Sequence, residues 1–296
     1  MRWLLLFAVS GLAAADLDHD NLPDKFEQQL LERFVPKFLV SANDCDVLPA
    51  AFAPHEPTPR PLTRTGALYG FVTPHANGDI EMHYYHLWAR DCGRGSHPLD
   101  VEHVSVLLHS PHPDHSAKHW RAVAWMAAGH QGTICDTAHG ARAHLLGAAQ
   151  QGPTVWVSQG KHASFLSQSW CARGCGGDRC ENTQIWHPRE IVNLGSVEHP
   201  LNGASWIQSH EWPLAAKLHP EFSPAVQTVI SHADGITNLY PALVPVKATV
   251  LAGGTTLNLF EAGTQHAGSG VATGAASVTG SLRKATRAVG NLFNRR

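Results

Sequence analysis

The sequence predicts a mainly β protein, a β-sandwich with peripheral helices and long loops stapled by disulfides. Short apolar stretches with alternating polarity recur along the chain between turn residues, a pattern typical of β-strands. The cysteines form an even set, which suits disulfide pairing in an exported protein; they are Cys45, Cys92, Cys135, Cys171, Cys175 and Cys180. The last three could instead bind zinc, although their spacing is wider than the usual two-residue zinc knuckle.

The start of the chain has the features of a secretory signal peptide. Arg2 and the apolar run Trp3–Leu12 precede the small residues Ala13–Ala15. We therefore expect residues 1–15 to be removed and the mature protein to be secreted or periplasmic. Three further parts are expected: an acidic loop with a helix at 16–40, the β-sandwich domain at 41–261, and a flexible Gly/Ala/Ser-rich tail at 262–296.

Charge is unevenly distributed along the chain. All 24 acidic residues lie within residues 16–261, whereas six of the 22 basic residues lie outside them. The remaining 16 bases against 24 acids leave this part with a net charge of −8, which argues against nucleic acid as a partner. The basic end, Ser281–Arg296, would be either an amphipathic helix that settles on membranes or a disordered tail.

The segment Asp16–Glu27 has the spacing of an EF-hand-type calcium loop. Loop positions 1, 3, 5, 9 and 12 carry carboxylates and position 7 offers a carbonyl; the residues are Asp16, Asp18, Asp20, Asp24 and Glu27, with Leu22 at position 7. Asn21 stands where glycine is usual, and asparagine is the residue next most willing to adopt a positive φ. A helix that buries Phe26 and Leu30 would follow. The alternative is an acidic helix N-terminus that only interacts with the helix dipole.

Several strands and one further helix are expected downstream. Leu68–Val72 and Ile80–Trp88 flank Asn77-Gly78, which is a hairpin signal. Arg121–Ala127 and Thr154–Ser158 also alternate as strands do. Between them, the Ala- and Leu-rich stretch from Asp136 to Gln150 predicts a helix.

The stretch His97–His103 brings metal-binding side chains to the start of an apolar run. In a strand, Asp100 and Glu102 share one face, and His97 can curl over them from the preceding loop. Two carboxylates and an imidazole suit a divalent cation, Ca²⁺ or Mg²⁺. The histidines His103, His130 and His162 are candidates for positions beside the metal. The alternative is a polar strand end exposed to solvent.

The order of these motifs resembles the necrosis- and ethylene-inducing peptide-like proteins. The matching stretches are Tyr85-His86-x-Trp88-x-x-Asp91, His97-x-x-Asp100-x-Glu102, Trp125…Gly129-His130 and Trp156…Gly160-Lys161-His162-Ala163. The resemblance implies an exported β-sandwich cytolysin whose metal engages sphingolipid head groups. It places the divalent metal on Asp91, His97, Asp100 and Glu102.

This sequence departs from the family's Gly-His-Arg-His-Asp-Trp-Glu hallmark. Ser96, Pro98, Leu99 and Val101 replace the glycine, the arginine, the second histidine and the tryptophan. The spacing of the metal positions is retained, so metal binding survives the comparison better than toxicity does. The segment Asp100–Val104 also resembles a family related to vacuolar protein sorting 62.

These observations predict a secreted, divalent-metal-binding protein, necrosis-inducing-like, that recognises a surface or membrane ligand such as a glycolipid head group. A metal-dependent hydrolase, with His130 or His162 as general base, is one alternative. A secreted structural protein is another. The sequence contains no Gly-x-Ser-x-Gly nucleophile motif, which favours a binding protein over an enzyme.

Overall fold

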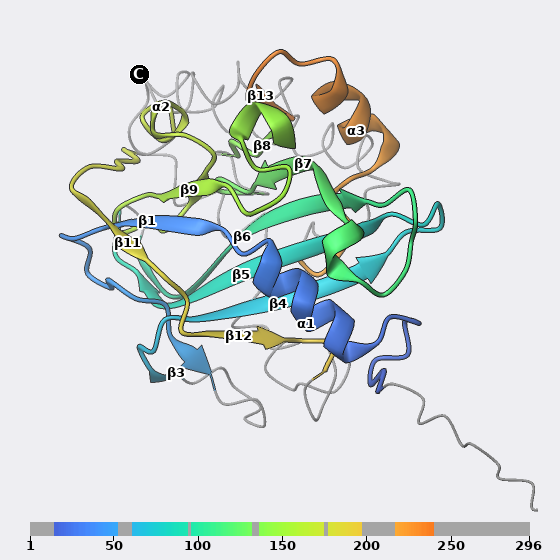
Figure 1. Cartoon of the computed structure of the whole chain (residues 1–296). Coiled ribbons are helices and arrows are strands. Elements are labelled where there is room, and N and C mark those ends of the chain that lie inside the picture. Colours follow the sequence, from blue (N-terminus) through green and yellow to red (C-terminus); the bar gives the residue numbers. More distant parts are fainter. Residues whose placement is uncertain are drawn as a thin grey trace, which may run out of the picture.

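The computed structural model describes residues 15–52, 61–93, 96–131, 136–174, 177–196 and 217–239, and it is mainly β as predicted (Figure 1). A seven-stranded sheet has the order β12-β4-β5-β6-β7-β8-β13 and faces a four-stranded sheet with the order β10-β9-β1-β11. The strands of the large sheet are β4 (Ala67–Pro74), β5 (Ile80–Asp91), β6 (His97–His109), β7 (Arg121–Ala127), β8 (His139–Arg142), β12 (Glu190–Asn193) and β13 (Thr237–Asn238). Those of the small sheet are β1 (Lys37–Ser41), β9 (Thr154–Val157), β10 (Ser164–Phe165) and β11 (Thr183–Trp186).

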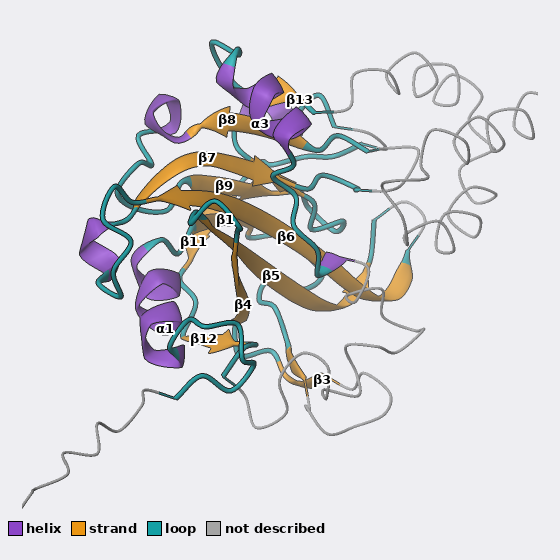
Figure 2. Cartoon of the chain, turned by 90° about the vertical axis from the view of Figure 1, so that its right-hand side faces the viewer, coloured by secondary structure: helices purple, strands orange, loops and turns teal. Residues whose placement is uncertain are grey.

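Helices lie at the two ends of the large sheet. Helix α1 (Asp24–Arg33) lies by the β12–β4 end, and α3 (Pro224–Ser231) lies by the β8–β13 end (Figure 2). The remaining elements are α2 (Gln168–Cys171), two short 3-10 helices (Ala117–His119 and Ala143–Leu146) and the paired strands β2 (Ala51–Phe52) and β3 (Pro61–Thr63). None of the helices in the described ranges has the length and apolar character needed to cross a bilayer.

The main core lies between the two sheets. Side chains alternate along a strand, so one face of β5 and β6 meets the small sheet. Tyr84, Trp88 and Val106 belong to the same buried cluster as Phe38 and Val155 of the small sheet. The opposite face of the large sheet is covered separately: Leu107 and Met126 pack with Phe222, Val226 and Ile230. The large sheet is thus buried on both faces, which makes the polar groups at its strand ends unusual.

Gly70 lets helix α1 approach strand β4 closely. A Cβ atom at this position would lie 2.5 Å from Cδ2 of Leu31, which is fully buried on α1. We expect Gly70→Ala to destabilise the protein by about 1–3 kcal/mol because the helix must move away. Gly235→Ala is the matched control, since a Cβ there meets nothing within 4 Å. Urea unfolding measures both; equal free energies of unfolding in the two variants would contradict this packing.

The hairpin and the strands beside it confirm the alternating pattern read from the sequence. Strands β4 and β5 pair antiparallel with Tyr69 opposite Tyr85, and β7 has the predicted bounds. The predicted helix from Asp136 to Gln150 is wrong. The segment forms β8 and a 3-10 turn because it pairs with β7, with Gly140 opposite Met126. Sheet pairing overrides the weak local helix preference of an alanine-rich stretch.

Two disulfides, Cys45–Cys92 and Cys171–Cys180, join described residues. The pairing of Cys171 with Cys180 rules out zinc binding by these two as thiolates, so the stapled-loop interpretation holds for them. Disulfides are consistent with export into an oxidising compartment. Cys135, Cys175, residues 1–14 of the predicted signal peptide and the predicted tail 262–296 lie outside the described residues.

Candidate metal and ligand site

The predicted metal-binding side chains lie where β5 ends and β6 begins. These strands pair antiparallel, with Asp91 opposite His97, Trp88 opposite Asp100 and His86 opposite Glu102. Asp100 and Glu102 therefore share the face of β6 that meets the small sheet. Asp91, Asp100 and Glu102 are 7%, 7% and 5% exposed, so three carboxylates are buried at one end of a strand pair. Carboxylates in such number are rarely buried without a cationic partner.

Asp91 and His97 form the outer part of this cluster. Nε2 of the exposed His97 lies 3.7 Å from Oδ2 of Asp91, while Oδ1 of Asp91 accepts a hydrogen bond of 2.6 Å from the Gly93 amide. Burial and the negative charge of Asp100 raise the pKa of Asp91 above its ordinary value. A cation placed between these groups would remove that penalty.

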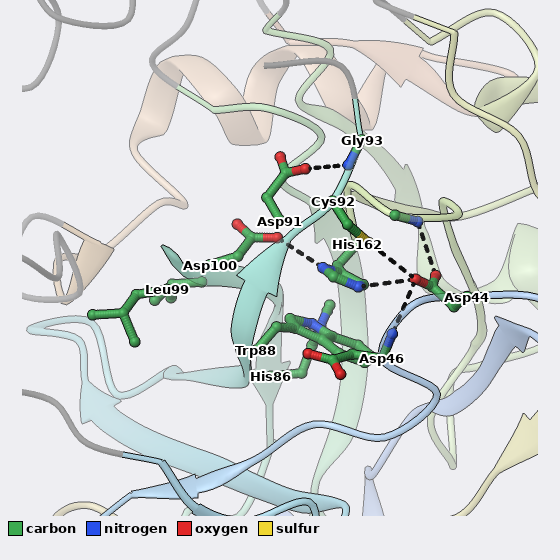
Figure 3. Close-up of polar contacts among 12 residues, drawn as sticks. Asp44, Asp46, His86, Trp88, Asp91, Cys92, Gly93, Leu99, Asp100 and His162 are labelled. Atoms are coloured by element: carbon green, nitrogen blue, oxygen red, sulfur yellow. Dashed lines mark hydrogen bonds and ion pairs between the residues drawn. The ribbon is translucent and has the colours of Figure 1, made fainter. Parts of the chain in front are cut away.

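Asp100 is held by His162, as Figure 3 shows. The Nδ1 atom of His162 lies 3.0 Å from Oδ2 of Asp100, and its Nε2 atom lies 3.4 Å from Oδ1 of Asp44. The ring stacks on Trp88 at 3.9 Å between centroids and 7° between planes. Burial alone would lower the pKa of His162, but the two carboxylates raise it to about 9. Burial alone would likewise raise the pKa of Asp100, yet its bond to His162 lowers it.

Glu102 has no such partner. Its Oε2 atom is buried and forms no hydrogen bond, and burial raises the pKa of Glu102 to about 8 even though the Lys217 ammonium favours the charged form. Lys217 donates its own hydrogen bond to the carbonyl of Val101. A buried carboxylate oxygen without a partner is uncommon in folded proteins and calls for an explanation such as an ion.

The three histidines proposed for positions beside the metal have different surroundings. His162 contacts Asp100 directly. The Nε2 atom of His130 is hydrogen-bonded to Oδ2 of Asp178 at 2.8 Å. The positive charge of His130 favours the ionised form of Glu102. His103 lies on the opposite face of the sheet beside the rings of His83 and Tyr85, so the structure does not bring it to the carboxylates.

The four predicted ligands lie at the same end of β5 and β6, but no three of them have ligand atoms that all lie within 4.8 Å of one another. In the described chain, two groups meet that distance: Asp44 with Cys45 and His162, and Asp16 with Asp18 and Asp20. Cys45 is in a disulfide and offers no thiolate. Asp44 was not identified from the sequence. The only local indication of a role is that this acidic residue stands next to a cysteine, Cys45. The contact of Asp44 with His162 depends on pairing between distant segments.

Strained backbone accompanies this cluster. Leu99, His130 and His162 all have positive φ angles, of 60°, 53° and 54°. Side chains other than glycine rarely adopt this region, which costs free energy that the surrounding structure must supply. Such outliers gather at functional sites more often than elsewhere, which supports a role for this end of the sheet.

A polar hollow of about 630 Å³ borders the cluster. Three cationic side chains line it, together with two amides and one carboxylate: Arg90, Lys161, Arg179, Asn43, Gln159 and Asp44. The Cys45–Cys92 disulfide forms part of its wall. Charged and amide groups of this kind recognise hydroxyl or phosphate groups of a polar ligand.

The predicted calcium loop forms a separate acidic cluster at the start of α1. Burial, with the charges of Asp20 and Asp18 adding to it, raises the pKa of Glu27 to about 8 despite a hydrogen bond from Asn193. Asp24 instead accepts a hydrogen bond of 3.0 Å from the Leu17 amide at its Oδ1 atom, and Leu22 donates its amide to Asp20.

The fold and the strand-end cluster define a mainly β, disulfide-containing protein with a candidate acidic–histidine metal site. No known family profile and no curated protein matches the chain. Solved structures that are similar include "Toxin fold for microbial attack and plant defense", 18% identical over 61% of this chain and 82% of that chain, with a TM-score of 0.34. A second, "NLPPya in complex with glucosamine", is 17% identical over 61% and 81%, with a TM-score of 0.35.

A third similar structure is Necrosis and Ethylene inducing Protein 2 from the causal agent of cocoa's Witches Broom disease. It is 15% identical over 75% of this chain and 99% of that chain, with a TM-score of 0.36. The resemblance to proteins related to vacuolar protein sorting 62 finds no support in these comparisons.

Proposed function

We propose that this chain is a secreted, divalent-metal-binding β-sandwich protein, necrosis-inducing-like in its motif order, that recognises a surface ligand such as a membrane glycolipid head group. Ca²⁺ or Mg²⁺ would be held by Asp91, His97, Asp100 and Glu102. The observation that carries the proposal is the buried Oε2 atom of Glu102, which has no hydrogen-bond partner.

The charge balance of the cluster fits a divalent cation. His162 compensates Asp100 and Asp44, and His130 compensates Asp178. Glu102 and Asp91 have weaker compensation, from Lys217 and Lys161 respectively, and burial still raises the pKa of both carboxyl groups. Oxygen ligands with one imidazole suit hard cations, which favours Ca²⁺ or Mg²⁺ over softer metals.

The polar hollow beside the cluster supplies the place for the ligand. Arg90, Lys161 and Arg179 line it, together with Asp44, which also faces His162. A head group that reaches from the hollow to the metal would be held through its oxygen atoms, by the cationic side chains of the hollow and by the metal ion. This arrangement supports recognition of a sugar- or phosphate-bearing ligand.

The geometry supports binding better than hydrolysis. A general base needs a ring nitrogen free to accept a proton from water. Both nitrogens of His162 face carboxylates and its ring is stacked on Trp88, while Nε2 of His130 is bonded to Asp178. His162 is therefore not placed to activate a water molecule.

Replacing Glu102 with glutamine should remove one bound divalent ion, because the variant keeps the shape and loses the charge. We expect the affinity for Ca²⁺ or Mg²⁺ at this site to fall by about 100-fold. Calorimetric titration in the Glu27→Gln background isolates the site from the acidic loop at the N-terminus. Asp234→Asn, at a fully exposed carboxylate, is the control.

An unchanged number of ions in Glu102→Gln would overturn the metal site. Ligand recognition has its own measurement: co-sedimentation of the full chain with vesicles that carry a glycosylated sphingolipid, with and without the metal. We expect metal-dependent binding in the parent protein and none in Glu102→Gln. Hydrolysis of phosphoester substrates that depends on the metal would favour the enzyme instead.

A further inference from the structure

We infer that the loop Asp16–Glu27 is a calcium site, independent of the strand-end cluster, that fastens the N-terminal segment to the turn after β12. The site consists of four carboxylates from Asp16, Asp18, Asp20 and Glu27. The evidence is their convergence, the lack of any partner for one oxygen of each, and their contact with residues 193–195.

Three of the carboxylates converge from a single tight loop. Ligand oxygens of Asp16, Asp18 and Asp20 lie within 4.8 Å of one another. Backbone amides of the loop hold one oxygen of two of these carboxylates. Asp16 Oδ2 accepts a hydrogen bond of 3.2 Å from the Asn21 amide, and Asp20 Oδ1 accepts one of 2.7 Å from the Leu22 amide. Asp16 Oδ1, Asp18 Oδ1 and Asp20 Oδ2 are buried without a hydrogen-bond partner.

Glu27 provides the independent observation. It is fully buried on the first turns of α1, with 0% exposed. Its Oε2 atom accepts a hydrogen bond of 2.9 Å from Nδ2 of Asn193, but its Oε1 atom is buried with no partner. The charged form of a fully buried carboxylate beside three others is strongly disfavoured unless a cation compensates it.

No cationic side chain of the described chain compensates this cluster. None of the four carboxylates pairs there with lysine, arginine or histidine, and their unpartnered oxygens are of the type that calcium prefers. Four oxygen ligands spaced at positions 1, 3, 5 and 12 of a loop match calcium better than magnesium, which demands a stricter octahedron.

The backbone is shaped for this loop. Asn21, at the position where such loops usually have glycine, has a φ of 75°, as the sequence predicts. His19 also lies in the left-handed region, with a φ of 62°. Asp24 closes the loop by accepting a hydrogen bond from the Leu17 amide at its Oδ1 atom.

The partner surface is the turn that follows strand β12. A Cβ atom at Gly195 would lie 2.7 Å from Asp18 Oδ2 and 3.1 Å from Glu27 Oε2, so only glycine leaves room for both carboxylates. The Gly195 amide donates to Oδ1 of Asn193, which orients the amide group that Asn193 presents to Glu27. An ion in the loop would therefore fix α1 and the edge strand β12 to each other.

The test uses the full mature chain and calcium alone. In calorimetric titration we expect Glu27→Gln to weaken calcium binding at this loop by about 100-fold, measured in the Glu102→Gln background. Glu32→Gln, an exposed residue on the same helix that removes the same charge, should bind as the parent does. Asp20→Asn, on the half-buried loop, is the second variant should Glu27→Gln fail to fold.

Thermal unfolding provides the second readout. Calcium should raise the melting temperature of the parent and of Glu32→Gln, and leave that of Glu27→Gln unchanged. Without calcium, Glu27→Gln should melt no lower than the parent, because glutamine keeps the shape of the side chain and places no charge beside the three aspartates. Calcium binding with parental affinity in both Glu27→Gln and Asp20→Asn would overturn the inference.

Discussion

Replacing Trp88 with alanine is expected to destabilise the protein by about 3–5 kcal/mol, because it removes the largest buried side chain beside the strand-end cluster and leaves a cavity. Trp88 is 0% exposed and its ring supports His162 at 3.9 Å. Its Nε1 atom donates a hydrogen bond of 2.7 Å to Nδ1 of His86. The substitution thus removes core volume, a stacking surface and a buried hydrogen bond together.

Trp88→Phe separates these contributions. Phenylalanine keeps an aromatic plane under His162 but leaves Nδ1 of His86 without its donor, and we expect a loss of about 1–3 kcal/mol. Urea unfolding of both variants gives the free energies. Val123→Ala, at a side chain that is 46% exposed, serves as control. A loss below about 1 kcal/mol in Trp88→Ala would contradict the packing described for this core.

Replacing Glu81 with glutamine is the second large effect. Glu81 is 0% exposed on β5 and ties the opposite face of the sheet to the segment that precedes α3. Its carboxylate meets Nε2 of His75 at 2.7 Å, Nε2 of His83 at 2.9 Å and the amide of Glu221 at 2.5 Å. An amide cannot accept all of these bonds, so we expect a loss of about 3–5 kcal/mol at neutral pH.

The pH dependence of stability identifies the charge of Glu81 as the cause. Burial alone would raise its pKa, but the hydrogen bond and charge of His83 lower it below the ordinary value of 4.5. A lowered folded-state pKa contributes stability that is fully present above about pH 4.5 and is lost as the pH falls through the folded value. The free energy of unfolding should therefore fall less steeply below that pH in Glu81→Gln than in the parent. Glu190→Gln, at an exposed carboxylate, should keep the parental slope.

Sequence patterns predicted those parts of the fold whose contacts lie close together in the chain, namely the β4–β5 hairpin and the conformation of the acidic loop. The strands of the hairpin flank an Asn-Gly turn, and the acidic loop carries its glycine substitute, Asn21, in the left-handed conformation. The small sheet was harder to foresee. Strand β1 pairs with β9 and β11, which lie far away in the sequence, so its five residues carry too little local signal to be distinguished from loop.

The strand-end cluster likewise has a part that the sequence predicts and a part that depends on tertiary packing. Asp100 and Glu102 share a face because of the strand period, which the sequence contains. The contact of His162 with both Asp100 and Asp44 joins three segments that only the sandwich brings together. Residue types can indicate metal chemistry, but which carboxylate a histidine neutralises depends on tertiary packing.

The pairing of β1 has a consequence for how the chain reaches its folded state. Lys37 pairs with Thr154 and Phe38 with Trp186, while β12 joins the edge of the large sheet with Glu190 beside Ala67. The small sheet is complete only with β11 (Thr183–Trp186) and the large sheet only with β13 (Thr237–Asn238), so contacts of high sequence separation must form together. Topologies of this kind fold in milliseconds to seconds rather than microseconds. Truncation before β11 would leave β1 with an open edge, and such a fragment should aggregate rather than fold.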